Sequence, residues 1–145
     1  MVNRLPLCFC FCLLTGAAQS QEAAEWKKLE GIWKIVILDS DGERFEGGFS
    51  SFDRIIIEKR KLIAKGVERT EEWGTLTIDL STSPKLMDLK EAAAKGNTAE
   101  GIYQLEGERL QICLGRNTLV KERPTQFPKE PQKGVLYLVL EREKR

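Results

Sequence analysis

GIYQLEGERLQICL, residues 101–114, predicts a β-hairpin. Apolar residues recur on both sides of a short turn, Glu106-Gly107-Glu108, whose central glycine allows the chain to reverse. Short apolar runs separated by turn residues continue along most of the chain. Runs of this length, with period two, are typical of consecutive antiparallel strands rather than of helices.

Six further strands are expected around this hairpin. The chain between residues 43 and 53, which contains Gly47 and Gly48, is expected to be a loop, as is the proline-containing stretch 115–133, because proline cannot donate to a central ladder. In the strand 72–80, Leu76 is expected on one face and Trp73 on the other, from simple alternation. The six expected strands are 31–38, 54–58, 62–64, 72–80, 85–90 and 134–140.

Eight short antiparallel strands favour a closed sheet, because closure removes exposed strand edges. The expected fold class is therefore all-β: a single antiparallel eight-stranded barrel, with a sandwich as the alternative. A barrel of eight strands is either filled by side chains or holds one small ligand. The expected division of the chain is a leader at 1–20, a short helix at 21–28 and the barrel domain at 29–142.

The first twenty residues have the features of a secretory signal peptide. Arg4 is their only charged side chain, an apolar run from Leu5 to Leu14 follows, and small residues come next. Small side chains at the −3 and −1 positions would allow cleavage after Ala18 or after Ser20. Ten apolar residues span about 15 Å as a helix, about half of a bilayer core, so no transmembrane anchor is expected after cleavage. The expected location is periplasmic or secreted.

The amino-acid composition argues against several classes of function. The 145-residue chain contains no histidine, which is the usual general base of nucleophilic sites and the commonest zinc ligand. Three of the four cysteines lie in the predicted leader, which leaves Cys113 as a buried strand residue or, less favoured, a reactive thiol. We expect no metal, no cofactor and no catalytic residue. Removal of Arg4 with the leader leaves equal numbers of acidic and basic residues, so nucleic-acid binding is not expected.

Two groups of residues carry a resemblance to a known family. The first is L-x-G-x-W at residues 29–33, followed by Asp41-Gly42. The second is G-I-Y at 101–103 with L-x-I-C at 110–113, followed by E-R-P-T-x-F at 122–127. In this order they resemble a family of small secreted lipocalin-like domains first catalogued in planctomycete bacteria, to which no activity is assigned. The similarity extends over residues 29–141.

The resemblance implies a lipocalin-like barrel, in agreement with the strand count. The pair Gly31 and Trp33 is similar to the start of true lipocalins, where the tryptophan plugs the closed end of the barrel. The resemblance implies that structural role for Trp33. True lipocalins often contain disulfides, whereas a mature chain with one cysteine cannot form one internally.

Four residues are candidates for ligand binding: Trp73, Tyr103, Arg123 and Phe127. Arg123 and Phe127 lie in a stiff, proline-flanked loop that could stand at the barrel mouth, and a guanidinium group suits carboxylates. The alternative for this loop is structural, with Phe127 covering a barrel end and Arg123 pairing with a carboxylate or capping carbonyls. Trp73 and Tyr103 are either pocket aromatics or core residues.

The expected function is a non-enzymatic extracytoplasmic binding module for a small apolar or amphipathic ligand. The alternative is a protein-interaction or envelope-structural domain with a solidly packed barrel. A carboxylate-dependent hydrolase ranks third, because Asp79 and Asp88 flank the same expected turn.

Overall fold

The computed structural model describes residues 13–49, 51–93, 96–116 and 122–144. One helix, α1 (Leu13–Leu29), precedes nine strands. The strands are β1 (Gly31–Ser40), β2 (Glu43–Glu46), β3 (Arg54–Glu58), β4 (Lys61–Lys65), β5 (Thr70–Asp79), β6 (Lys85–Glu91), β7 (Thr98–Glu106), β8 (Arg109–Gly115) and β9 (Val135–Arg142). All eight expected strands are present.

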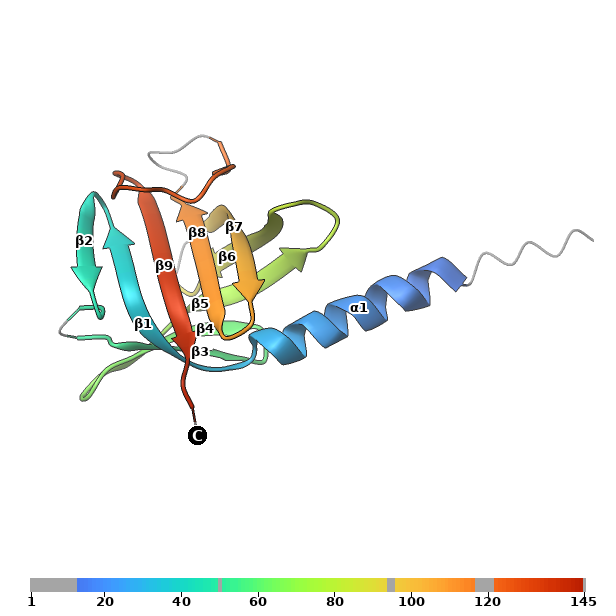
Figure 1. The fold of residues 1–145 in the computed structure, drawn as a ribbon, viewed down its shortest axis with the longest axis horizontal. Coiled ribbons are helices and arrows are strands. Elements are labelled where there is room, and N and C mark those ends of the chain that lie inside the picture. Colours follow the sequence, from blue (N-terminus) through green and yellow to red (C-terminus); the bar gives the residue numbers. More distant parts are fainter. Residues whose placement is uncertain (1–12, 50, 94–95, 117–121, 145) are drawn as a thin grey trace, which may run out of the picture.

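The strands form a closed antiparallel barrel (Figure 1). Each strand from β3 to β9 pairs with the next, and β1 joins the two ends because it pairs with both β3 and β9. The ring therefore contains eight strands, β1 and β3–β9, and the expected fold class is confirmed. Each of these eight strands is paired on both sides with antiparallel neighbours, so none of the eight is an edge strand.

The sequence pattern did not indicate β2. The first half of β1 pairs with β3, from Gly31↔Ile57 to Lys34↔Arg54, while its second half pairs with β2 from Ile37↔Glu46 to Ser40↔Glu43. β2 thus continues the edge of β1 where β3 has ended. It contains only Glu43-Arg44-Phe45-Glu46, and its charged residues and short length explain why residues 43–53 were expected to be a loop.

The helix is longer than expected, since α1 begins at Leu13 rather than Gln21. The predicted signal segment up to residue 12 lies outside the described residues. Figure 1 shows the C-terminal end of α1 at one end of the barrel and the β8–β9 connection at the opposite end. Among the described helices, none combines the length and the apolar character needed to cross a membrane.

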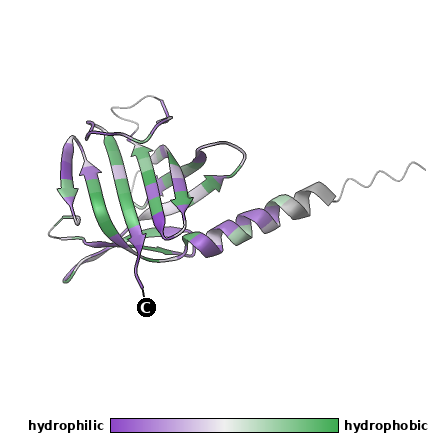
Figure 2. Cartoon of the chain, in the orientation of Figure 1, coloured by the Kyte–Doolittle hydropathy of each residue, from purple (hydrophilic) through white to green (hydrophobic). Residues whose placement is uncertain are grey.

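One hydrophobic cluster occupies the interior of the barrel, and a second one lies on the outer surface of part of its wall. Inward residues of β9, including Leu138 and Leu140, are fully buried in the interior cluster. The alternate residues Val135, Tyr137 and Val139 form a second cluster with Ile102 and Cys113. Burial on both faces explains why β9 is hydrophobic along most of its length (Figure 2).

Candidate functional site

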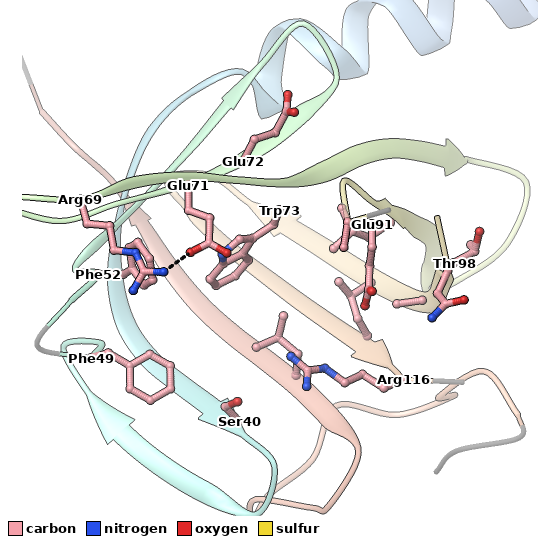
Figure 3. A pocket seen from close by; sticks show the side chains of 16 residues that line it. Ser40, Phe49, Phe52, Arg69, Glu71, Glu72, Trp73, Glu91, Thr98 and Arg116 are labelled. Carbon is pink, nitrogen blue, oxygen red and sulfur yellow. Dashed lines mark ion pairs between the residues drawn. The ribbon is translucent and has the colours of Figure 1, made fainter. Parts of the chain in front are cut away.

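The end of the barrel away from α1 contains a pocket of about 680 Å³ (Figure 3). It lies where β1, β6 and β8 end and where β5, β7 and β9 begin, and the segment before β3 completes its walls. The lining residues are Ser40, Phe49, Phe52, Arg69, Glu71, Glu72, Trp73, Leu89, Glu91, Ala93, Asn97, Thr98, Ala99, Leu114, Arg116 and Leu136.

The deeper part of the pocket is apolar. Phe52, Leu89, Leu114 and Leu136 are all buried, and each is at the same time a member of the barrel core. Phe52 packs edge-on against Trp73, with ring centroids 6.1 Å apart. An apolar lining with a few polar groups at the rim is the common composition of small-molecule sites.

A β-bulge places Trp73 in this pocket. Leu62 pairs with Gly74 but Ile63 pairs with Glu72, so Trp73 is the extra residue on β5. The alternation therefore shifts by one at this point, and Trp73 packs against the same interior core as Leu76. The expectation that Trp73 and Leu76 occupy opposite faces was wrong, because a bulge interrupts period two without changing the composition of the strand.

Gly74 fits this bulge because its backbone has φ +156° and lies against β6. A Cβ atom there would stand 2.0 Å from the carbonyl oxygen of Lys90. The Ala92 amide donates to the Trp73 carbonyl at 3.0 Å, which holds the end of β6 beside the bulge. The position of the Trp73 ring is thus set by backbone contacts from both neighbouring strands.

The rim carries charged side chains. Arg69 pairs with Glu71 at 3.1 Å and lies over the Phe52 ring, 5.4 Å from its centroid. Glu72, on the other side of the strand, pairs with Lys61 at 2.9 Å. Figure 3 shows Glu71 pointing toward the Arg69 guanidinium and Glu72 pointing away from it. These pairs satisfy three of the rim charges within the protein.

The opposite end of the barrel is closed by the C-terminal turn of α1. Trp33 is fully buried there, and its indole Nε1 donates to the Leu29 carbonyl at 2.9 Å. The Arg142 guanidinium lies over the Trp33 ring at 4.3 Å from the centroid and donates to the Glu30 carbonyl at 2.9 Å and to the Lys28 carbonyl. Trp33 therefore lies at the closed end of the barrel.

Gly31 makes this closure possible. Its φ is +141°, and a Cβ atom would lie 2.8 Å from Nη1 of Arg142. The absent side chain therefore leaves room for the guanidinium to reach the Lys28 and Glu30 carbonyls at the end of α1. Carbonyls at a helix C-terminus receive no hydrogen bond from the helix itself.

Tyr103 lies at the closed end rather than in the pocket. It is fully buried, and its hydroxyl donates to Oε1 of Glu25 on α1 at 2.9 Å. Lys85 donates to the same oxygen at 3.0 Å. Burial, and then the hydrogen bond to the Glu25 carboxylate, raise the pKa of the Tyr103 phenol far above its usual value. This trio attaches α1 to β6 and β7.

Arg123 and Phe127 lie on the outer surface, because the β8–β9 connection folds back over the barrel wall. Arg123 donates to the Gly101 carbonyl at 2.8 Å and pairs with Asp88 on β6. Phe127 contacts the ring of Tyr137 at a centroid distance of 6.2 Å. Neither residue lines the pocket at the mouth. Arg123 pairs with a carboxylate and caps a carbonyl, as in the structural alternative.

Cys113 lies under the same connection and is 1% exposed. Burial raises the pKa of its thiol to about 12. A hollow of about 250 Å³ lies beside it and is lined by Pro124, Pro128 and their neighbours. A thiol that stays protonated at neutral pH is a poor nucleophile, so this environment suits a core residue.

Asp79 and Asp88 engage separate partners on the outer face. Asp79 accepts from the amide and hydroxyl of Ser81, which lowers its pKa, while Asp88 pairs with Arg123. In the part of the chain that the structure describes, no group of three or more His, Cys, Asp or Glu residues is arranged to hold a metal ion.

Comparison with protein-family models, with curated proteins and with solved structures gives no match to this chain. Of the four residues expected to bind ligand, the structure places Trp73 alone in the pocket. The other pocket aromatics, Phe49 and Phe52, come from the segment that was expected to be a loop. Their aromatic character within a glycine-containing stretch was a signal that could have indicated them.

Proposed function

We propose that this chain is a non-enzymatic binding protein whose barrel takes one small amphipathic molecule through its open end. The pocket of about 680 Å³ carries this proposal. Its volume falls within the range of roughly 300–1,000 Å³ typical of small-molecule sites. The buried leucines and aromatic rings at its base suit an apolar portion of the ligand, and the charged rim suits a polar end.

The closed end supports the same function. Trp33, Leu29, Trp26 and Tyr103 fill the interior near α1, and the pocket lies on the opposite side of the core. A ligand entering from the open end would therefore rest on a rigid base. Preformed sites of this kind avoid the entropic cost of ordering side chains on binding.

The protein-interaction alternative has less support. It requires a solidly packed barrel and an apolar surface patch. Within the described residues, the large hydrophobic side chains that are exposed are Ile32, at 42%, in β1 and Val67, at 95%, between β4 and β5. Isolated apolar residues of this kind are ordinary on protein surfaces.

We further propose that the protein acts outside the cytoplasm, as a member of the lipocalin-like secreted family that it resembles. The charge and apolar pattern of residues 1–20 supports export. The residues that attach α1 to the barrel, Glu25, Trp26 and Leu29, all follow Ser20. Cleavage after Ala18 or Ser20 would therefore keep the closed end intact.

Native mass spectrometry of the protein purified from its own envelope, before and after organic extraction, tests the binding proposal. We expect an extra mass that extraction removes. A variant that fills the pocket, Ala99→Trp, should abolish that mass, since Ala99 is a buried lining residue. Thr77→Trp, on the exposed face of β5, is the matched control. A bare protein that also fails to bind added amphiphiles would refute the proposal.

A further inference from the structure

Two charged side chains at the pocket have no ion-pair partner among the described residues. Glu91 ends β6, and Arg116 directly follows β8. The other charged lining residues, Arg69, Glu71 and Glu72, are paired as described above. Figure 3 shows Arg116 extending into the pocket and Glu91 on the neighbouring wall, with no ion pair drawn between them.

The two charges have opposite signs and come from strands on either side of β7. An anionic ligand would be attracted by Arg116 and repelled by Glu91. A cationic ligand would be attracted by Glu91 and repelled by Arg116. A ligand that carries both charges gains from both residues. Glu91 is half-buried, so a ligand charge beside it is screened less by water than on an open surface, whereas Arg116 is exposed at the rim.

The cationic half of such a ligand has a second partner. Gly74 pairs with Glu91 and Trp73 precedes it in the bulge, so the Trp73 ring and the Glu91 side chain enter the pocket from adjacent positions. Indole is the best ring for attracting ammonium groups. Arg69 already covers Phe52, whereas no described cation lies over Trp73.

We propose that the ligand is a zwitterionic amphiphile with one apolar chain. Its ammonium or quaternary ammonium group is held by Glu91 and Trp73, its phosphate or carboxylate group is held by Arg116, and its chain lies on Leu89, Leu114 and Leu136. This inference rests on the proposed function, since it names the chemistry of the ligand for the same pocket.

The test uses four amphiphiles with the same twelve-carbon chain, each below its micellar concentration. They are dodecylphosphocholine, dodecanoate, dodecyltrimethylammonium and dodecyl maltoside, and calorimetry of the purified protein measures each dissociation constant. We expect dodecylphosphocholine to bind about tenfold more tightly than the other three, since one charge-assisted contact is worth about a factor of ten.

Two variants test the contributions of Glu91 and Arg116 separately. Glu91→Gln should weaken dodecylphosphocholine and dodecyltrimethylammonium by about tenfold and leave dodecanoate no weaker, whereas Arg116→Gln should weaken dodecylphosphocholine and dodecanoate instead. Glu58→Gln and Arg109→Gln are the matched controls, because Glu58 is exposed at the end of β3, Arg109 begins β8 at the far end of that strand from Arg116, and neither lines the pocket. Both controls should bind all four compounds as the parent does.

The outcomes distinguish the two proposals. Equal binding of all four compounds, unchanged in both variants, would overturn the zwitterion inference and leave the binding function in place. Tightest binding of dodecanoate with sensitivity to Arg116→Gln alone would overturn it in favour of an anionic ligand. Failure of every compound to bind would overturn both the inference and the proposed function.

Discussion

At the scale of single residues, Gly101 shows why one motif position must lack a side chain. It is buried in β7 where the strand faces β8, and a Cβ atom would lie 2.0 Å from the carbonyl oxygen of Cys113 and 2.6 Å from the Leu114 side chain. The obstructing oxygen belongs to the backbone, so a side-chain rotation cannot relieve the contact. Gly101 also presents its own carbonyl to Arg123.

Gly101→Ala is therefore expected to destabilise the barrel strongly, by about 2–4 kcal/mol, because β7 must separate from β8. Chemical denaturation followed by circular dichroism measures the change. Gly107→Asn is the control: Gly107 has φ +58°, which asparagine tolerates, and nothing lies within 4 Å of its Cβ position. Equal loss of stability in the two variants would contradict this explanation.

At the scale of elements, the β3–β4 turn has a backbone that its sequence does not favour. Lys59 and Arg60 have φ values of +50° and +64°, the left-handed conformation that tight hairpins require but that glycine and asparagine adopt at lower cost. The turn brings Arg60 over the Trp26 ring, 5.6 Å from its centroid, and so contacts the helix that closes the barrel.

Lys59→Asn is expected to stabilise the protein by about 0.5–1 kcal/mol, since asparagine relieves the strain and leaves Arg60 in place. Thermal unfolding should show the increase. Lys65→Asn, at the end of β4, provides the comparison, and we expect no gain there because asparagine is unfavourable in strands. A lower melting temperature for Lys59→Asn would refute the assignment of strain to this turn.

The contacts that attach α1 to the barrel lead to a second prediction at this scale. Trp26→Ala should cost about 3–5 kcal/mol, because a buried ring at the closed end is lost. A protein lacking residues 1–20 should unfold within about 3 °C of the full chain, since Glu25, Trp26 and Leu29 remain. Differential scanning calorimetry compares the three proteins. A large loss on removing residues 1–20 would show that the preceding part of α1 is essential.

At the scale of the whole molecule, stability is expected to fall at alkaline pH. The pKa of Cys113 is raised to about 12 by burial, and burial also raises the pKa values of Tyr103 and Tyr137. These groups lose protons more readily in the unfolded chain than in the folded barrel. Their contribution to the free energy of unfolding is complete at pH values below the pKa of the unfolded chain, which is about 9 for the thiol. For Cys113 this contribution is lost as the pH approaches 12.

Between pH 9 and pH 12 the free energy of unfolding should therefore decrease, by up to about 1.4 kcal/mol per pH unit for each group. Urea titrations across this range measure the slope, and Cys113→Ala should make it shallower between pH 9 and pH 10. An unchanged slope in Cys113→Ala would show that the thiol is not protected by the fold.

Local pattern was sufficient for the eight strands of the ring and for the closed sheet. Period-two runs and turn residues are local properties, and closure follows from the need to pair every strand edge. The expectation that Trp33 plugs one end came from the resemblance and not from local pattern. One strand, β2, was missed because four mostly charged residues contain no hydrophobic period, and its pairing depends on the length of β1.

Tertiary structure alone decided which residues form the pocket. Trp73 reaches the interior through a bulge defined by pairing with β4, and Arg123 and Phe127 reach the outer face because the β8–β9 connection packs on the apolar outer side of β9. Glu91 and Arg116 are 25 residues apart, and the pairing of β6 and β8 with β7 brings them to one rim. The physical reason is that alternation is a local property, whereas register, bulges and closure depend on partners that lie far away in the sequence.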